Sequence, residues 1–282
     1  SLSARSSHAM AFDFRRSVAV LFGGMSVNVG LNADTWEWSG SSWLQRVVSG
    51  PSARSDHAMA YDAARGVTVL FGGSSGSAET WEWNGTDWTQ RVVSGPAGRS
   101  GHAMAYDAAR GVTVLFGGST SSGRSAETWE WNGTVWTQRM VSGPSARFGH
   151  AMAYDAARGA TVLFGGYAGY DLYSAELWEW NGTAWKQRVI SGPSGRSSHA
   201  MAYDAARDVT VLFGGYAGSG GYGYDFAETW ELRFNYCPAD FDHDGFVNGD
   251  DYDFFAEAFD AADPAADFNA DGFVNGDDYD AF

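Results

Sequence analysis

The chain has 282 residues, of which 18% are charged and 16% aromatic, and it contains 37 glycines. This composition excludes a disordered, coiled-coil or collagen-like protein and indicates an aromatic, turn-rich globular fold. The net charge of −16 comes almost entirely from residues 237–282, which hold 14 acidic side chains and no lysine or arginine. Because nucleic-acid binding needs a basic surface, we do not expect it here. The sequence contains no run of about 18 to 20 apolar residues, which is the length that would predict a membrane span.

Comparison of the chain with itself reveals five copies of one repeat. Each copy resembles HAMAYDAARGVTVLFGG, and the copies begin at His8, His57, His102, His150 and His199. The spacings of 49, 45, 48 and 49 residues lie in the range of propeller blades. The repeats therefore predict a β-propeller with one blade per repeat.

The second copy shows the four strands expected in each blade. Residues 57–62 alternate small and large side chains, and residues 67–71 form a nearly unbroken apolar run, typical of a strand buried on both faces. Residues 80–83 and 88–93 follow as the third and fourth strands. Asn84-Gly85 between them is a strong hairpin-turn signal because both residues tolerate positive φ.

The repeat resembles the kelch family in three features: a double glycine after the second strand, an aromatic residue on the third and a tryptophan opening the fourth. The double glycines are Gly72-Gly73, Gly117-Gly118, Gly165-Gly166 and Gly214-Gly215. The resemblance implies an all-β fold, a kelch-type β-propeller of about five four-stranded blades over residues 1–235. The fifth repeat breaks after Leu232 without the segment of the fourth strand. We expect an upstream segment to supply that strand, and the alternative is a three-stranded last blade with an open edge.

One face of such a propeller carries loops that differ between repeats. The loops joining the second and third strands vary in length and become richer in tyrosine towards the fifth repeat, whereas the loops of the opposite face are nearly constant. Variable loops on a constant scaffold favour recognition, although simple drift in loop length also accounts for them. The predicted ligand-binding residues are Asn28, Asn32, Arg124, Tyr167, Tyr170, Asp171, Tyr173, Tyr216, Tyr222, Tyr224 and Asp225.

Other chemistry on this face is less well supported. An arginine precedes the first histidine of each repeat by three residues, as Arg54 precedes His57. Because every repeat has this pair, a structural role is favoured over an anion site. The carboxylates of Asp34, Asp171 and Asp225 would suit a glycosidase only if they converged. No catalytic motif occurs, so no catalytic residue is assigned.

The acidic tail contains two near-copies of a twelve-residue loop, residues 240–251 and 267–278. Each places oxygen-bearing side chains at positions 1, 3, 5, 9 and 12 and glycine at position 6, which is the spacing of an EF-hand calcium loop. We therefore predict two Ca²⁺ ions. The predicted ligands, which include two backbone carbonyls from phenylalanines, are Asp240, Asp242, Asp244, Phe246, Asn248, Asp251, Asp267, Asn269, Asp271, Phe273, Asn275 and Asp278.

These loops end in aspartate and are followed by a helix-like stretch at residues 252–259. Together they resemble a type I dockerin, which implies that residues 236–282 form a small α-helical, calcium-dependent module that docks onto a cohesin. The second helix stops short, which predicts a C-terminally truncated module. Partner contacts carried over from the family fall on Gly249, Asp250, Gly276 and Asp277. The alternative is a calcium-stapled cap that binds no partner.

The expected function combines these parts. We expect a secreted bacterial protein, located outside the cell or at its surface, whose propeller face recognises a protein or glycan. The dockerin-like tail would anchor it to a cohesin-type or cell-surface partner. The alternative is a polysaccharide-active propeller enzyme carried by the same anchor, and the sequence gives no positive sign of that catalysis.

Overall fold

The computed structural model describes residues 2–74, 76–169, 172–219, 222–233, 249–261, 266 and 273–275. The chain divides into two compact units, Ser1–Leu232 and Arg233–Phe282. The division falls close to the change of composition that separates the repeats from the acidic tail. Each unit is described by itself.

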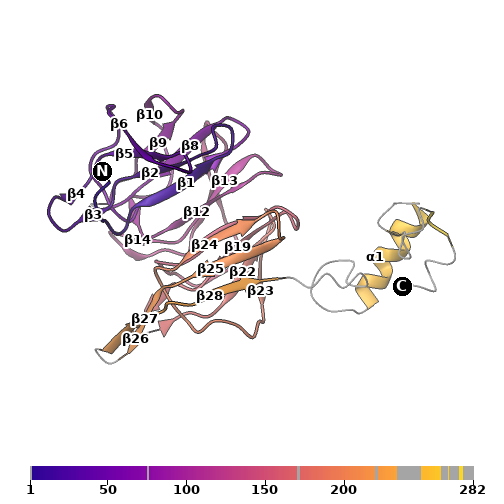
Figure 1. Cartoon of the computed structure of the whole chain (residues 1–282). Helices are drawn as coiled ribbons and strands as arrows, with labels where there is room; N and C mark the ends of the chain where they lie inside the picture. The colour runs from indigo at the N-terminus through magenta and orange to yellow at the C-terminus, as the bar shows by residue number, and fades with distance from the viewer. Residues whose placement is uncertain are drawn as a thin grey trace. The chain divides into compact units, whose positions relative to one another are not determined.

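Within the described residues, the first unit is all β and contains five main antiparallel sheets, numbered 1 to 5 in chain order (Figure 1). Sheet 1 contains β1 (Ala9–Asp13), β2 (Val18–Phe22), β5 (Thr35–Trp38) and β6 (Trp43–Arg46). Sheet 2 contains β7 (Ala58–Asp62), β8 (Val67–Phe71), β9 (Thr80–Trp83) and β10 (Trp88–Arg91). Sheet 3 contains β12 (Ala103–Asp107), β13 (Val112–Phe116), β16 (Thr128–Trp131) and β17 (Trp136–Arg139). Sheet 4 contains β18 (Ala151–Asp155), β19 (Ala160–Phe164), β22 (Leu177–Trp180) and β23 (Trp185–Arg188).

Sheet 5 has three strands among the described residues: β24 (Ala200–Asp204), β25 (Val209–Phe213) and β28 (Thr229–Leu232). The four strands predicted for the second repeat are confirmed as β7, β8, β9 and β10. In every sheet the strands pair in chain order, and the first strands β1, β7, β12, β18 and β24 pack side by side. The arrangement is propeller-like.

Neighbouring sheets pack through one recurring apolar contact. The preceding sheet contributes two alanines, a valine and a phenylalanine, which we call the plug set, and the following sheet contributes a methionine, a leucine and two tryptophans, which we call the socket set. Between sheets 2 and 3 the plug set is Ala58, Ala60, Val69 and Phe71, and the socket set is Met104, Leu115, Trp131 and Trp136. The same sets recur between sheets 3 and 4. Burial of these side chains supplies the main stabilisation of the junctions.

In sheets 1, 2 and 3 the phenylalanine of the plug set lies between a tryptophan and a histidine of the next sheet. The Phe71 ring lies 5.3 Å from Trp136 and 5.6 Å from His102, both edge-to-face. This geometry also explains the double glycine. Gly72 has a φ of +71°, and a Cβ there would lie 2.5 Å from the carbonyl oxygen of Arg99. The glycine therefore permits both the turn and the close approach of the next sheet.

At each junction a buried glutamate forms ion pairs with two arginines of its own sheet. The carboxylate of Glu82 accepts hydrogen bonds from Arg65 at 2.6 Å and Arg91 at 2.7 Å within sheet 2. It also accepts one from the Trp131 indole of sheet 3 at 3.1 Å. Glu37 and Glu130 are equivalently bonded. These glutamates face the next sheet, not solvent.

The junction between sheets 4 and 5 departs from this pattern. Leu177 replaces the threonine that accepts a tryptophan hydrogen bond in the earlier sheets, as Thr80 accepts one from Trp136 at 2.9 Å. Leu232 occupies the place of Trp131 and its equivalents. Both replacements remove a polar group, so this junction is more apolar than the others.

In the second unit the described residues contain one helix, α1 (Gly249–Asp260), which includes the helix-like stretch predicted at residues 252–259. Phe255 on α1 is fully buried, and its ring lies 5.9 Å from that of Phe259. In the part of the chain that the structure describes, no helix is long and apolar enough to cross a membrane.

Candidate functional site

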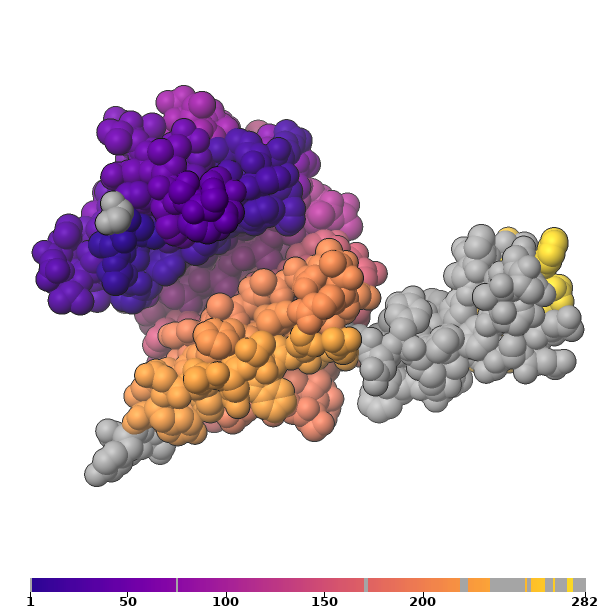
Figure 2. Space-filling view, viewed as in Figure 1, coloured from indigo at the N-terminus to yellow at the C-terminus, as the bar shows by residue number. Residues whose placement is uncertain are grey.

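Four small hairpins project from the sheets between their second and third strands. They are β3–β4 (Met25–Ser26, Gly30–Leu31), β14–β15 (Ser119–Thr120, Gly123–Arg124), β20–β21 (Tyr167–Gly169, Leu172–Tyr173) and β26–β27 (Tyr216–Ser219, Tyr222–Asp225). The hairpins of sheets 1 and 5 project from the same side of the first unit (Figure 2). We call this side the loop face. The short strand β11 (Arg99–Ser100) pairs with β14 of the second of these hairpins.

One guanidinium and three tyrosine rings form a continuous row across the hairpins of sheets 3, 4 and 5. The guanidinium of Arg124 lies 5.7 Å from the ring centroid of Tyr167. Tyr167 lies 5.2 Å from Tyr173, which lies 5.8 Å from Tyr216, and both ring pairs are edge-to-face. Phe148 packs on Tyr167 at 5.4 Å. Four predicted ligand-binding residues therefore come together, although they are 92 residues apart in the sequence from Arg124 to Tyr216.

The row presents aromatic surface to solvent. Within the row, Tyr216 is 39% exposed and Arg124 is also exposed. Tyr224, which is 58% exposed, lies outside the row on β27, opposite Ala217. Tyr224 packs on Phe226 with a centroid distance of 5.0 Å, and Phe226 in turn lies under Arg196. The tyrosines are therefore held by their neighbours, which lowers the entropy cost of ordering them on binding.

The hairpin of sheet 1 is apolar. Its exposed side chains include Met25, Val27 and Val29. Asn28 lies at its exposed turn, whereas Asn32 is buried and donates hydrogen bonds to Gly24, Ser26 and Gly30. The Asn32 amide thus holds the hairpin together instead of facing solvent.

The remaining predicted ligand-binding residues are placed as follows. Asp225 lies on β27 directly opposite Tyr216. Tyr222 also lies on β27, but its side chain is outside the described residues. Tyr170 and Asp171 lie outside the described residues altogether.

A small polar pocket of about 280 Å³ lies beside Arg124. Its lining comprises Ala97, Thr120, Ser122, Arg124, Ser125, Ala126 and Glu127. Burial raises the pKa of the Glu127 carboxyl, but hydrogen bonds from Arg99 and Trp129 outweigh it, so the pKa lies below its usual value. The lining of the pocket therefore includes the Arg124 cation and the Glu127 carboxylate, which is paired with Arg99.

The arginine and histidine pairs have structural contacts. The buried Arg54 guanidinium donates to the Gly72 carbonyl at 2.9 Å and to Glu79 at 2.6 Å. Burial, and then the charge of Arg54, lowers the pKa of His57 to about 3. In sheets 2 to 5 the equivalent histidines are buried and the arginines are paired, so these residues do not offer the free positive charge that an anion site needs. His8 of sheet 1 is exposed.

Of the carboxylates considered for glycosidase chemistry, Asp34 is already paired. Asp34 accepts hydrogen bonds from Arg5 and from the Trp36 indole at 2.6 Å. Burial raises the pKa of Asp34, but these bonds outweigh it and hold the pKa below its usual value. A carboxylate paired in this way is a poor general acid.

The predicted calcium ligands fall mainly outside the described residues. These are Asp240, Asp242, Asp244, Phe246, Asn248, Asp267, Asn269, Asp271 and Asp278, as are the predicted partner contacts Gly276 and Asp277. Gly249, Asp250 and Asp251 begin α1, but their side chains are not described. Phe273 is 73% exposed and Asn275 half-buried. Among the described residues, no three His, Cys, Asp or Glu side chains gather as a metal site.

Sequence reasoning missed two features of the loop face. It did not predict that the variable loops form hairpins, because their strands are only two to four residues long. It also missed Phe148, which replaces the serine found at this position in the other four repeats. An alignment of the repeats shows this difference, and it could have identified Phe148 as a residue of the loop face.

Comparisons with known proteins support the fold. The solved structure of YjhT superposes on this chain with a TM-score of 0.61 and 15% sequence identity, covering 77% of this chain and 74% of YjhT. No family of known proteins matches the sequence. No curated protein matches it either. The likeness to YjhT concerns the fold alone.

Proposed function

We propose that this chain is a binding protein whose loop face recognises a protein or glycan ligand. The observation that carries the proposal is the row of rings from Arg124 through Tyr167 and Tyr173 to Tyr216, which crosses three sheets. Tyrosines fixed by their neighbours offer large, amphipathic contact area at low entropy cost. The four groups come from three repeats and lie outside the apolar clusters that already join the sheets.

The chemistry of the loop face favours a protein ligand. The hairpin of sheet 1 exposes Met25, Val27, Val29 and Leu31 together, and Leu172 of sheet 4 is 58% exposed. Exposed aliphatic side chains beside tyrosines are typical of protein interfaces. The polar pocket beside Arg124 would then take a charged or hydroxylated group of the same ligand.

The loop-face proposal is tested by capture from envelope and secreted fractions of the producing organism, followed by titration of the purified ligand. Tyr173→Ala and Tyr216→Ala should each weaken binding about tenfold or more, as expected for central aromatic contacts. The matched control is Val135→Ala, which lies in a turn on the opposite face and is 51% exposed. Equal binding by all three variants would contradict the proposal. Binding of a purified polysaccharide that shows the same losses would identify the ligand as a glycan.

We further propose that the first unit is a kelch-type propeller and the tail a dockerin-like module. The kelch assignment is supported by the repeated double glycine, whose tight approach to the next sheet is seen at Gly72, Gly117 and Gly165. The tail assignment is supported by the duplicated loop and by the position of α1. This helix begins at Gly249, position 10 of the first predicted loop, as expected when a helix follows a calcium loop.

The residues of the tail suit calcium in their chemistry. Each loop offers carboxylate, amide and backbone oxygens, the hard ligands that Ca²⁺ prefers. Asp240, Asp242, Asp244 and Asp251 would hold the first ion, and their mutual repulsion without it would oppose folding. Bound calcium would supply folding free energy to a module too small for a large core.

The tail proposal has its own experiment. Isothermal titration of the full chain should show two calcium sites, and the double variant Asp244→Ala/Asp271→Ala should lose both. Asp260→Asn, at the end of α1 and outside both loops, is the control and should retain them. Full calcium binding by the double variant would contradict the proposal.

We propose that the tail anchors a secreted protein to a cohesin-like or cell-surface partner. Capture of that partner by the full chain should need calcium and should be lost with EDTA and with Asp244→Ala/Asp271→Ala. Capture independent of both would leave the tail as a calcium-stapled cap. Because Tyr173→Ala leaves the tail intact, loss of ligand binding at the loop face can be distinguished from loss of anchoring through the tail.

A further inference from the structure

The two ends of the series of sheets expose complementary halves of the junction that joins the sheets internally. Sheet 5 carries a plug set, Ala200, Ala202, Val211 and Phe213, and sheet 1 carries a socket set, Met10, Leu21, Trp38 and Trp43. Phe213 is 55% exposed, whereas its equivalents Phe22, Phe71, Phe116 and Phe164 are at most 2% exposed. Met10 is 46% exposed, whereas Met59, Met104 and Met152 are each 7% exposed. The two ends therefore do not cover one another.

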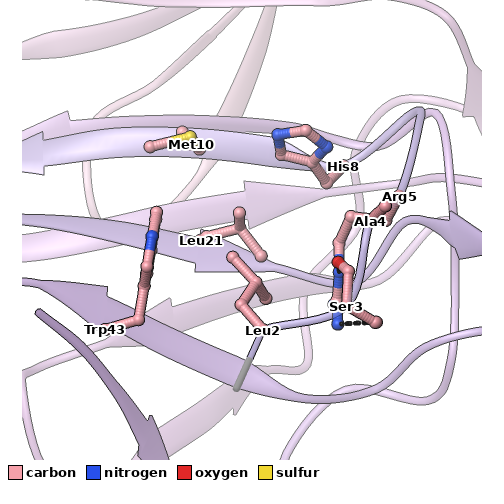
Figure 3. A pocket seen from close by; sticks show the side chains of 8 residues that line it. All are labelled: Leu2, Ser3, Ala4, Arg5, His8, Met10, Leu21 and Trp43. Carbon is pink, nitrogen blue, oxygen red and sulfur yellow. Dashed lines mark hydrogen bonds between the residues drawn. The ribbon is translucent and has the colours of Figure 1, made fainter.

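The socket of sheet 1 is already formed. Trp38 and Trp43 lie 5.5 Å apart, the same distance as Trp83 and Trp88 in the filled socket of sheet 2. Around Trp43 lies an open pocket of about 680 Å³, lined by Leu2, Ser3, Ala4, Arg5, His8, Met10, Leu21 and Trp43. Figure 3 shows His8, Met10, Leu21 and Trp43 arranged around it.

The position of this pocket is occupied in the internal junctions. In sheet 2 the equivalents of His8 and Trp43 are His57 and Trp88, and the ring of Phe22 from sheet 1 contacts both at 5.6 and 5.3 Å. Val20 and Phe22 pack with Met59 and Leu70 in the same cluster. The pocket of sheet 1 thus has the shape and lining that receive a valine and a phenylalanine from a preceding sheet.

We propose that the gap between sheet 5 and sheet 1 is a docking site for one further sheet of this repeat type. That sheet would insert its own plug set into the pocket of sheet 1 and present its own socket set to Phe213. The segment that carries this sheet would also supply one additional strand to pair with β28, the outer strand of sheet 5 among the described residues. A single sheet satisfies both ends at once.

A second copy of this chain fits less well. Its sheet 1 would receive Phe213, but its next four sheets would follow into the same gap, because successive sheets turn around a common centre in a propeller. The contact would also be head-to-tail, which leaves a free end at every step. Docking of one sheet within the chain would not depend on protein concentration, whereas association of two chains would.

Methionine oxidation gives a direct readout of the pocket. In the full chain, dilute peroxide should oxidise Met10 nearly as fast as the exposed Met140 and about tenfold or more faster than Met59, since oxidation follows exposure. Mass spectrometry of peptides reports all three rates in one sample. Met59 reports that the first unit remains folded.

The decisive variant carries one additional sheet in the full chain. A copy of residues 132–190, inserted between Leu232 and Arg233, supplies a fourth strand for sheet 5 and a complete sixth sheet. Met10 oxidation should slow to the rate of Met59, while Met140 remains reactive. Replacing the inserted counterpart of Phe164 by serine should restore rapid oxidation, because the plug is lost while the strand beside β28 is retained.

Four results would overturn the proposal. The first is that Met10 stays unprotected in a folded insertion variant, and the second is that Met10 is already as slow as Met59 in the natural chain at every concentration. Protection that grows with concentration in the natural chain and disappears with Phe213→Ser would assign the gap to a second copy. A second insertion, the copy of residues 84–142, repeats the test with another sheet. If neither insertion leaves Met59 protected, the gap does not accept a sheet and the proposal fails.

Discussion

The Trp131 indole of sheet 3 donates a hydrogen bond to Glu82 of sheet 2 across 3.1 Å, where Glu82 is only 2% exposed. This bond ties two successive repeats through a charged group. The same carboxylate is held by Arg65 and Arg91 of its own sheet. The junction between sheets is therefore polar at one point and apolar around it.

Removal of that carboxylate should be costly. Glu82→Ala leaves two guanidiniums and an indole without their acceptor, and we expect a loss of about 3 kcal/mol in the free energy of unfolding. Urea unfolding monitored by tryptophan fluorescence measures it. Asp87→Ala, in the exposed turn after the third strand of sheet 2, serves as the control and should change stability little. A loss at Glu82 no larger than at Asp87 would show that the network does not stabilise the junction.

The tryptophan and threonine pair between sheets should be replaceable by apolar groups. Trp136 donates to Thr80 at 2.9 Å, so Trp136→Phe leaves a buried hydroxyl unpaired and should cost about 1 kcal/mol more than loss of the contact area. Adding Thr80→Val should recover part of that cost, since both polar groups are then gone. The natural Leu177 at the equivalent position indicates that the third strand accepts an apolar residue there. A double-mutant cycle of urea midpoints checks it, and purely additive effects would refute the coupling.

The double glycine should resist substitution. Gly117 has a φ of +69°, and a Cβ there would lie 2.8 Å from both the Arg147 carbonyl oxygen and the His150 ring. Gly117→Ala should therefore destabilise the protein by more than about 1 kcal/mol. Gly76→Ala is a matched control because its φ of +66° is nearly the same but no atom lies within 4 Å of the added Cβ. Equal melting temperatures for the two variants would contradict the role of close approach.

Stability should fall as the pH drops below 6.5. Burial, and then nearby arginines, lowers the pKa of His57 and His150 to about 3 and that of His199 to about 4, from a usual value of 6.5. Between these values the unfolded chain binds protons that the folded chain does not, so acid favours unfolding by about 1 kcal/mol per pH unit for each histidine.

The carboxylates act in a different pH range. The pKa values of Glu79, Glu127 and Glu176 lie below 4.5 because of their arginine partners, so their contribution is lost only below pH 4.5. Urea unfolding at pH 7 and pH 5 therefore isolates the histidines. His150→Gln should make the decline between these two values shallower. Identical stability at pH 7 and pH 5 would refute this account.

The sequence predicted the strands well because they carry strong local signals. The apolar run from Val67 to Phe71 and the Asn84-Gly85 turn fix the second and third strands of sheet 2 without reference to the rest of the fold. The loop face was also foreseen, since topology alone places the variable loops on one side.

The glutamate network could not be predicted in the same way. An acidic residue between two tryptophans, as in Glu82, is expected to face solvent when only strand periodicity is considered. Its partners come from the turn at Arg65, from the fourth strand at Arg91 and from the next repeat at Trp131. Only the packing of one sheet on another brings these four groups together. The ring contact between Tyr173 and Tyr216 has the same origin, because it joins two different repeats.

The leucines at positions 177 and 232 make the two ends of the series of sheets differ in how readily they open. Without the two indole hydrogen bonds, sheet 5 is coupled to sheet 4 more weakly than sheets 2, 3 and 4 are coupled to one another. Opening should therefore start at sheet 5 as a separate subglobal event, and its amide protons should exchange with solvent before those of β13 and β19. The tyrosines of β26 and β27 belong to the hairpin of sheet 5, the sheet expected to open first. The position of these tyrosines on the loop face therefore depends on the least stably attached sheet.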